Sequence, residues 1–238
     1  MSKLLQEPEN SLINQSHHSR ERDEPLNGDG FGVGWYNRDV HREPAALRSV
    51  RPAWNDRNLG GIAPKVRSDC IVAHIRAATR GEVTEQNCHP FQFNELIMMH
   101  NGTVKGFTRM KRILRQQLSD DLYDWVRGST DSEHFFALFL ENLQAHKEEV
   151  TLAKAAKALP KTIAQIEEMK TQVGVDDPVT LNLAFTNGDW LLSCKYATPS
   201  TGTPNTLYFS QGTRYECEDG VCRMVQSDPS ERAVLVVS

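Results

Sequence analysis

The stretch NGDGFGVGWY, residues Asn27–Tyr36, places a glycine at every second position of an apolar segment. Side chains of a β-strand alternate between two faces, so Phe31, Val33 and Trp35 share one face and the glycines leave the other bare. Glycine weakens a strand, and it often marks a place where another group approaches the backbone closely. The pattern therefore predicts a strand whose bare face meets a backbone, a side chain or a ligand. The glycine spacing is not that of a phosphate-binding loop, so we expect no nucleotide site here.

The next apolar run, Asp69–Ala77, is also predicted to be a strand. Period-two geometry puts Val72, His74 and Arg76 on one of its faces. A buried arginine is costly unless it meets an anion. From this pattern alone, Arg76 could form a structural ion pair or bind an anionic group of a ligand.

A further strand, predicted for Asn94–Asn101, ends at the dipeptide Asn101-Gly102 in the motif MHNGT. Asn-Gly is a strong signature of a tight hairpin turn. The same pair could instead direct a side-chain amide and a peptide N–H at a developing negative charge, as an oxyanion hole does. Taken by themselves, these residues favour the turn.

The segment GSTDSEHFF, residues Gly128–Phe136, has the signature of a helix start, with a capping box of Thr130 and Glu133 before an apolar run. Asp131 then lies in the first turn, where the helix dipole favours a carboxylate. Asp131 could simply stabilise the helix, or it could bind an ammonium group.

The rest of the chain contains helical patterns followed by strands. We predict a helix with a basic, solvated face over 107–127, and another over 151–173 that is interrupted near Pro160. Residues 41–68 are expected to form a loop with a short helix. Strands over 179–185 and 190–196 flank a hairpin, and two shorter strands follow at 206–210 and 232–237. This order indicates an α+β fold with largely antiparallel sheets, in a single domain over 1–238.

The composition is that of a globular protein of 238 residues with a net charge of −4, which argues against nucleic acid as the main partner. No apolar run approaches the roughly 20 residues of a membrane helix, and the start lacks the apolar core of a signal peptide. The cysteines show no zinc-ligand spacing. We therefore expect reduced thiols, a cytoplasmic location, no membrane partner, no metal and no cofactor.

Five motifs, in this order along the chain, resemble those of the class II glutamine amidotransferases: NGDGFGVGWY, AHIRAATRG, NCHPF, MHNG and STDSE. Within that family, the chain resembles more closely the small stand-alone branch that contains the γ-glutamyl amide hydrolases of glutathione breakdown and ergothioneine synthesis. The resemblance implies an N-terminal-nucleophile hydrolase fold, a four-layer αββα sandwich of two antiparallel sheets. It also implies hydrolysis of glutamine or γ-glutamyl amides through a thioester on a cysteine whose own α-amine serves as the base.

The resemblance also implies roles for individual residues. Arg76 matches the arginine that pairs with the α-carboxylate of the substrate, Thr79 matches a residue that helps to hold the same head group, and Asp131 matches the acid that receives the α-ammonium. Asn101 and Gly102 match the oxyanion hole of the family. The implied partner is a small γ-glutamyl substrate, together with an acceptor or partner subunit where ammonia is passed on.

Three residues of these motifs are expected to be structural. His74 and His89 should brace strands and loops by hydrogen bonds rather than carry a chemical step. Cys88, beside His89, cannot provide a free α-amine and is interpreted as a structural thiol.

The chain departs from the family pattern at its start, which reads Met-Ser-Lys where the family begins Met-Cys-Arg on a buried strand. We therefore expect the first strand and the nucleophile to be absent, and the domain to be truncated at both ends. Three hypotheses follow: a fragment or misplaced start of an active hydrolase, a catalytically inactive γ-glutamyl-binding or partner subunit, and a protein in which Ser2 replaces the cysteine. Pro8 does not fit a central strand, so the third is the least favoured.

Overall fold

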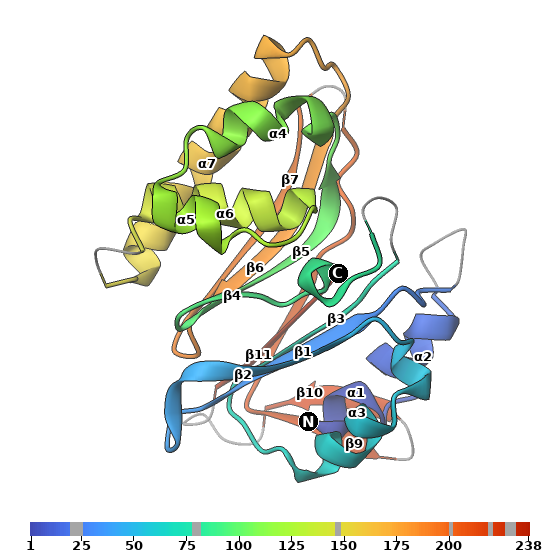
Figure 1. The fold of residues 1–238 in the computed structure, drawn as a ribbon. Coiled ribbons are helices and arrows are strands. Elements are labelled where there is room, and N and C mark those ends of the chain that lie inside the picture. Colours follow the sequence, from blue (N-terminus) through green and yellow to red (C-terminus); the bar gives the residue numbers. More distant parts are fainter. Residues whose placement is uncertain (20–25, 78–81, 146–148, 200–201, 219–220, 227–231) are drawn as a thin grey trace.

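The computed structural model describes residues 1–19, 26–77, 82–145, 149–199, 202–218, 221–226 and 232–238. Two antiparallel sheets lie against each other, and helices cover the outer face of each (Figure 1). This arrangement confirms the predicted α+β class with antiparallel sheets. Within these residues, no helix is both long enough and apolar enough to cross a membrane.

The first sheet has the strand order β2-β1-β3, with all pairs antiparallel. Its strands are β1 (Phe31–Asn37), β2 (His41–Ser49) and β3 (Ile71–Ile75). The loop expected at 41–68 therefore contains a strand. Pro44 concealed it, because a proline is excluded from a central strand but can be accommodated at the edge of a sheet, where β2 lies.

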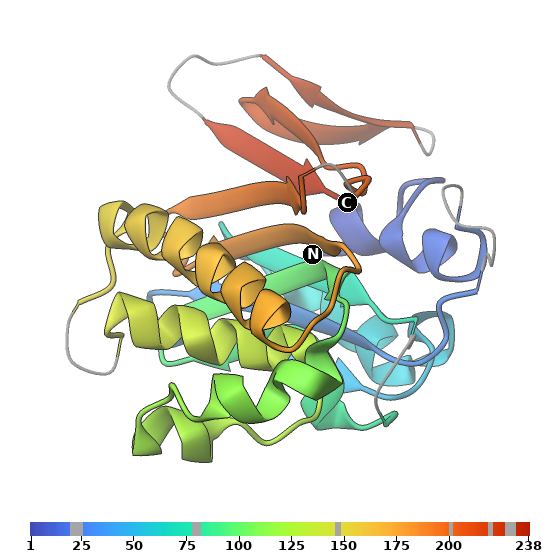
Figure 2. The ribbon, with the colours of Figure 1, turned by 90° about the horizontal axis from the view of Figure 1, so that it is seen from above.

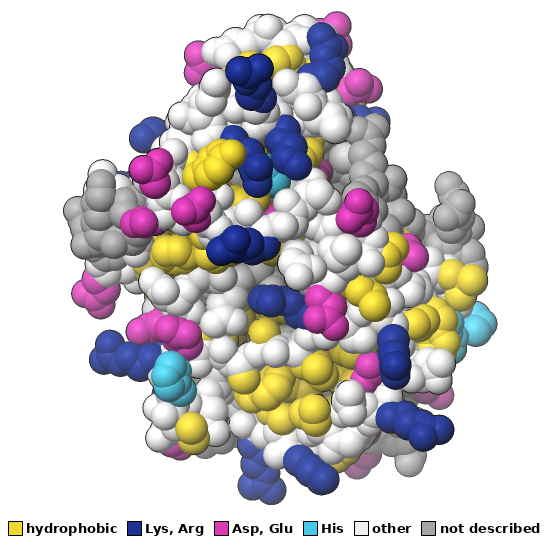
Figure 3. All heavy atoms as spheres, viewed as in Figure 1, with side chains coloured by type: hydrophobic (Ala, Val, Ile, Leu, Met, Phe, Trp, Pro, Cys, Tyr) yellow, Lys and Arg dark blue, Asp and Glu magenta, His cyan; other side chains and the backbone are white. Residues whose placement is uncertain are grey.

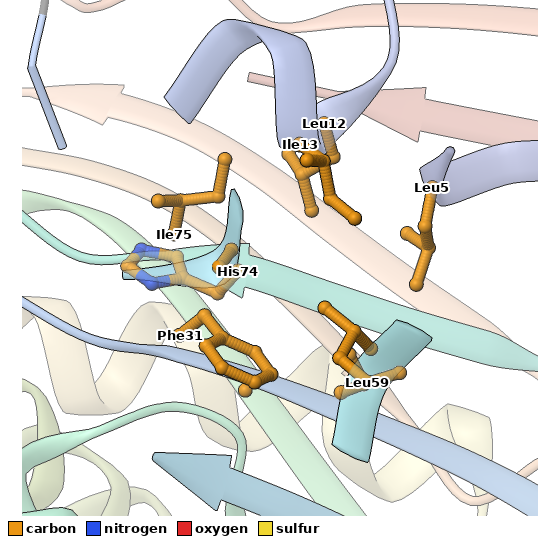
Figure 4. Close-up of a pocket in the computed structure, with 10 residues that line it drawn as sticks. Leu5, Leu12, Ile13, Phe31, Leu59, His74 and Ile75 are labelled. Atoms are coloured by element: carbon orange, nitrogen blue, oxygen red, sulfur yellow. The ribbon is translucent and has the colours of Figure 1, made fainter. Parts of the chain in front are cut away.

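Three short helices cover the outer face of this sheet: α1 (Ser2–Leu5), α2 (Leu12–His17) and α3 (Arg57–Ile62). Two 3₁₀ turns, Ala53–Asn55 and Ala63–Lys65, flank α3. Apolar side chains of the three helices and of β1 surround a cavity of about 10 Å³ (Figure 4). A space of this size is about that of one water molecule.

The inner face of β1 is the bare face that the glycines predict. A Cβ on Gly32 would lie 1.8 Å from the carbonyl oxygen of His89, and one on Gly34 would lie 2.9 Å from Ile97 of the second sheet. The predicted close packing is thus confirmed, and the groups that contact the bare face are the backbone and side chains of the protein itself.

The second sheet has the order β4-β5-β6-β7. Its strands are β4 (Phe91–Phe93), β5 (Leu96–Val104), β6 (Val179–Thr186) and β7 (Leu191–Ala197). Helices pack on its outer face: α4 (Phe107–Arg115), α5 (Asp120–Trp125), α6 (Asp131–Leu143) and α7 (Leu152–Gln172) (Figures 1 and 2). Their apolar sides and the sheet form the main core, in which the rings of Phe139 and Phe185 stack at 4.3 Å.

Lysine and arginine side chains gather over α4, where Arg109 and Arg112 are exposed (Figure 3). The basic, solvated face is confirmed on α4, but residues 107–127 form the two helices α4 and α5 and not the single helix predicted.

Helix α7 continues through Pro160, so the predicted interruption is wrong. A proline inside a helix costs about 3 kcal/mol because it removes one backbone hydrogen bond and crowds the preceding turn. Helix α7 buries a row of side chains on both sides of the proline, which offsets that cost. These buried residues include Ala155, Ala158, Ile166 and Met169.

The C-terminal part of the chain forms two small ladders. Strand β8 (Tyr208–Gly212) pairs with β11 (Ala233–Val237), and β9 (Arg214–Glu218) pairs with β10 (Val221–Val225). Cys222 of β10 is disulfide-bonded, which corrects the expectation that every thiol is reduced. The end of β11 lies near the middle of the molecule in both views (Figures 1 and 2).

Replacement of Gly32 by alanine tests the close contact between the sheets. The new methyl group would overlap the backbone of His89, and we expect Gly32→Ala to lower the free energy of unfolding by about 3 kcal/mol. Urea denaturation followed by circular dichroism measures the change. The matched control is Gly61→Ala on α3, where no atom lies within 4 Å of the added Cβ and the helix should gain up to about 1 kcal/mol. Equal effects of the two substitutions would contradict the packing described.

Candidate functional site

The dipeptide Asn101-Gly102 lies inside β5 and not in a turn. Strand β5 continues to Val104, and Asn101 and Gly102 pair with Asn182 and Leu181 of β6. Gly102 has a φ of +155°, and a Cβ there would lie 2.1 Å from the carbonyl oxygen of Thr180. Glycine is therefore required by the neighbouring strand, which is why a turn signature occurs in the middle of a ladder.

Asn101 is the exposed residue of an otherwise largely buried strand. Its side-chain amide Nδ2 donates a hydrogen bond of 3.0 Å to the hydroxyl oxygen of Ser238. The amide is thus accessible from solvent and already donates to an oxygen atom.

Asp131 lies in the first turn of α6, as the capping box predicts. The Thr130 hydroxyl accepts a hydrogen bond of 3.2 Å from the backbone N–H of Glu133. The Asp131 carboxylate accepts two more, from the N–H of Val104 at 2.7 Å and from the N–H of Ser132 at 2.9 Å. These donors hold the Asp131 side chain at the end of β5.

A second hydrogen bond attaches α6 to β5. The imidazole Nδ1 of His100 lies 2.8 Å from the Ser132 hydroxyl, and both side chains are buried. Burial lowers the pKa of His100, while the nearby Asp131 carboxylate opposes this shift. The helix start is therefore fixed on both sides of Asn101-Gly102, at His100 and at Val104.

Arg76 follows the end of β3 and is 6% exposed. Both terminal nitrogens of its guanidinium donate to the carbonyl oxygen of Glu82, each at 3.2 Å. The amide of Asn87 donates to the same carbonyl at 2.8 Å and also pairs with Ser129. Hydrogen bonds thus connect Arg76 through Asn87 to the loop that leads into α6.

The other predicted carboxylate-binding residue, Thr79, lies outside the described residues, which omit 78–81.

The sequence analysis does not assign two residues of this region to the site. Asn87 joins the Arg76 loop to Ser129, and Glu133, only 4% exposed, accepts the backbone N–H groups of Arg127 and Gly128 at 3.0 and 2.8 Å. Burial raises the pKa of Glu133, although these N–H donors act against the shift. The NCHPF motif and the capping box contain the two residues, but neither motif by itself indicates these long-range partners.

The rings of His74, which is partly buried, and His89, which is buried, lie tilted against each other instead of bracing the loops by hydrogen bonds. Their rings lie 4.2 Å apart, and Nδ1 of His74 and both ring nitrogens of His89 have no partner within the structure described. The expectation of hydrogen-bonded braces is therefore wrong at these three atoms. Burial lowers the pKa of His74 to about 4 and that of His89 well below its usual value, so both rings are neutral near pH 7.

The free thiols of the described residues are protonated at neutral pH. Burial raises the pKa of Cys70, Cys88 and Cys194. The Cys88 thiol lies 3.5 Å from the carbonyl oxygen of Thr84 and fills the space left by Gly30. A thiol of this kind is a poor nucleophile.

A family model described as glutamine amidotransferases class-II matches residues 9–199. This chain belongs to the class-II glutamine amidotransferase family. Arg76, Asn101, Gly102 and Asp131 all lie within the matched range.

Relatives of known name support this assignment. "Probable glutamine amidotransferase DUG3" of Saccharomyces cerevisiae is 37% identical over 256 residues, which cover 100% of this chain and 72% of the relative. "Gamma-glutamyl-hercynylcysteine sulfoxide hydrolase" of Mycolicibacterium smegmatis is 33% identical over 195 residues, covering 81% of this chain and 72% of that protein. A solved class-II glutamine aminotransferase domain protein from Silicibacter pomeroyi superposes with a TM-score of 0.64 at 30% identity, over 87% of this chain and 79% of that one.

The buried histidines predict a loss of stability in acid. Because burial lowers the pKa of His74 from 6.5 to about 4 in the folded state, the unfolded chain binds protons that the folded chain excludes. Stability is therefore retained above pH 6.5 and falls between pH 6.5 and 4, by up to about 1.4 kcal/mol per pH unit for each such histidine.

Urea unfolding across this pH range measures the slope. The variant His74→Gln should have a shallower dependence on pH, whereas His41→Gln, at an exposed position, should keep the slope of the wild type. A wild-type stability that does not change between pH 6.5 and 4 would exclude this account.

Proposed function

We propose that this chain binds the amino-acid head group of glutamine or of a γ-glutamyl amide, and that the reaction of this site is hydrolysis of the γ-amide bond. The main supporting observation is the attachment of the Asp131 carboxylate to β5, beside Asn101 and Gly102. Strand β5 then holds two polar groups. The Asp131 carboxylate can accept hydrogen bonds from an ammonium group, and the Asn101 amide can donate a hydrogen bond to a carbonyl oxygen.

Each proposed role follows from the chemistry of the group. The Asp131 carboxylate has acceptor positions beyond its backbone donors, and these suit the α-ammonium of the ligand. Arg76 presents a planar fork for the α-carboxylate, with its bonds to the Glu82 carbonyl exchanged for that ion pair. Thr79 would assist there. The amide of Asn101 and the N–H of Gly102 would stabilise negative charge on the γ-carbonyl oxygen.

The names of the relatives support the substrate class. One is named as a glutamine amidotransferase and another as a hydrolase of a γ-glutamyl compound. Both names refer to cleavage or transfer at the γ-carbonyl of a glutamate unit, which is the bond that the proposed geometry would address.

A second candidate is binding of the same head group without turnover. The observation that favours it is the state of the possible nucleophiles within the described residues. The free thiols have raised pKa values, and Ser2 lies in α1, where its hydroxyl donates to Glu7 on the outer layer. Catalysis by this family needs the N-terminal cysteine that the resemblance implies.

Isothermal titration calorimetry with L-glutamine tests head-group binding. Asp131→Asn keeps an acceptor for the Val104 N–H but removes the charge, and Arg76→Lys removes the planar fork. We expect each change to weaken binding by about 2 kcal/mol or more, because an ion pair in a partly buried site is lost. Arg109→Ala, on the exposed face of α4, is the control and should bind as the wild type does. Unchanged affinities in folded Asp131 and Arg76 variants would remove the proposal.

Glutamate release from glutamine and from glutathione separates the two candidates. We expect no release by this chain of 238 residues. The same chain preceded by a strand that begins Met-Cys-Arg should release glutamate, and replacement of that cysteine by alanine should abolish the release. Release by the chain of 238 residues that disappears in Ser2→Ala would show instead that serine is the nucleophile.

A further inference from the structure

Asn182 is a buried amide in the middle of β6. Its residue is 4% exposed, and it lies on the face opposite to that of Leu181 and Leu183, which belong to the main core. Asparagine is disfavoured in strands, and a buried amide is costly unless its hydrogen-bonding groups are used. We therefore expect the Asn182 amide to form hydrogen bonds with polar neighbours.

The polar neighbour is shared with Asn101. Asn182 Nδ2 donates to the Ser238 hydroxyl oxygen at 2.6 Å, and Asn101 Nδ2 donates to the same atom at 3.0 Å. Asn182 also donates to the carbonyl oxygen of Thr206 at 2.7 Å. Two amides from neighbouring strands thus converge on one oxygen atom.

The sheet itself fixes this convergence. Asn101 and Asn182 are directly opposite each other in the β5–β6 ladder, so their Cβ atoms are about 5 Å apart and their side chains leave the same face. Donors that are held at hydrogen-bond distance from one oxygen position before a ligand arrives are what oxyanion stabilisation requires. Ser238 is exposed at the end of β11, so its hydroxyl can leave that position without uncovering a core.

We propose that Asn182 is a second side-chain amide of the ligand site, and that Asn182 and Asn101 together hold the γ-oxygen of a glutamate-like ligand. This inference rests on the proposed function. The Ser238 hydroxyl oxygen stands in for the ligand oxygen. Hydrogen bonds to a charged acceptor are about twice as strong as those to a neutral one, so the pair favours a γ-carboxylate, or an oxyanion, over a neutral amide oxygen.

The test is calorimetric titration of the full chain with L-glutamate and, separately, with L-glutamine. Asn182→Ala is expected to weaken glutamate binding about tenfold and glutamine binding less, because the lost donor served a charged oxygen. Asn101→Ala should act in the same direction. The double variant should lose less than the product of the two single effects, since both amides serve one atom.

Two further variants separate ligand binding from a merely structural role. Asn142→Ala removes a half-buried amide from α6, where it bonds Thr162 and Gln165, and should leave the ratio of the two affinities unchanged. Ser238→Ala removes the hydroxyl to which both amides donate, while Asn182 keeps its bond to the Thr206 carbonyl, and this variant should bind glutamate as tightly as the wild type or more tightly. If Asn182 only anchors β11, Asn182→Ala and Ser238→Ala will both lower stability and leave the ratio unchanged, which overturns the inference.

The outcome also distinguishes this inference from the proposed function. A wild-type chain that binds neither amino acid refutes both. A chain that binds them, and is weakened by Asp131→Asn but not by a folded Asn182→Ala, refutes the role of Asn182 alone.

Discussion

The hydrogen bond from the Val104 N–H to the Asp131 carboxylate is the interaction on which the candidate site depends. It attaches the first turn of a helix to the end of a strand, and the His100–Ser132 bond repeats the attachment on the other side of Asn101-Gly102. Asp131 would otherwise be an ordinary first-turn residue that stabilises its helix. Held in this way, a charge and an amide from distant parts of the sequence keep a fixed separation.

Close contact between the two sheets is the second constraint. The glycines of β1 admit the His89 backbone and Ile97, so the central strand of the first sheet approaches the second sheet closely. His89 and Arg76 are buried, and Nδ1 of His74 is shielded from water. Burial between the sheets therefore lowers the pKa of both histidines. It also leaves the Arg76 guanidinium to donate to the carbonyl oxygen of Glu82.

Local patterns predicted much of the fold. The glycine alternation, the helix N-cap at Thr130 and the hairpin at Thr186–Asp189 agree with the structure, since each depends on a few neighbouring residues. Errors occurred where distant contacts outweighed local preference. A strand was missed around Pro44 at a sheet edge, and Pro160 was expected to break a helix that tertiary packing keeps intact.

By itself, the sequence determined the strand and helix periods, the positions of Asp131 and Asn101 along the chain, and a resemblance to one family. Tertiary structure alone decided that Asn-Gly runs through a ladder rather than a turn, because Thr180 leaves no room for a Cβ at residue 102. It also decided that Asn101 and Asn182 share one oxygen partner. The physical reason is that hydrogen bonds and close contacts join residues by distance in space, whereas a sequence pattern records only their order.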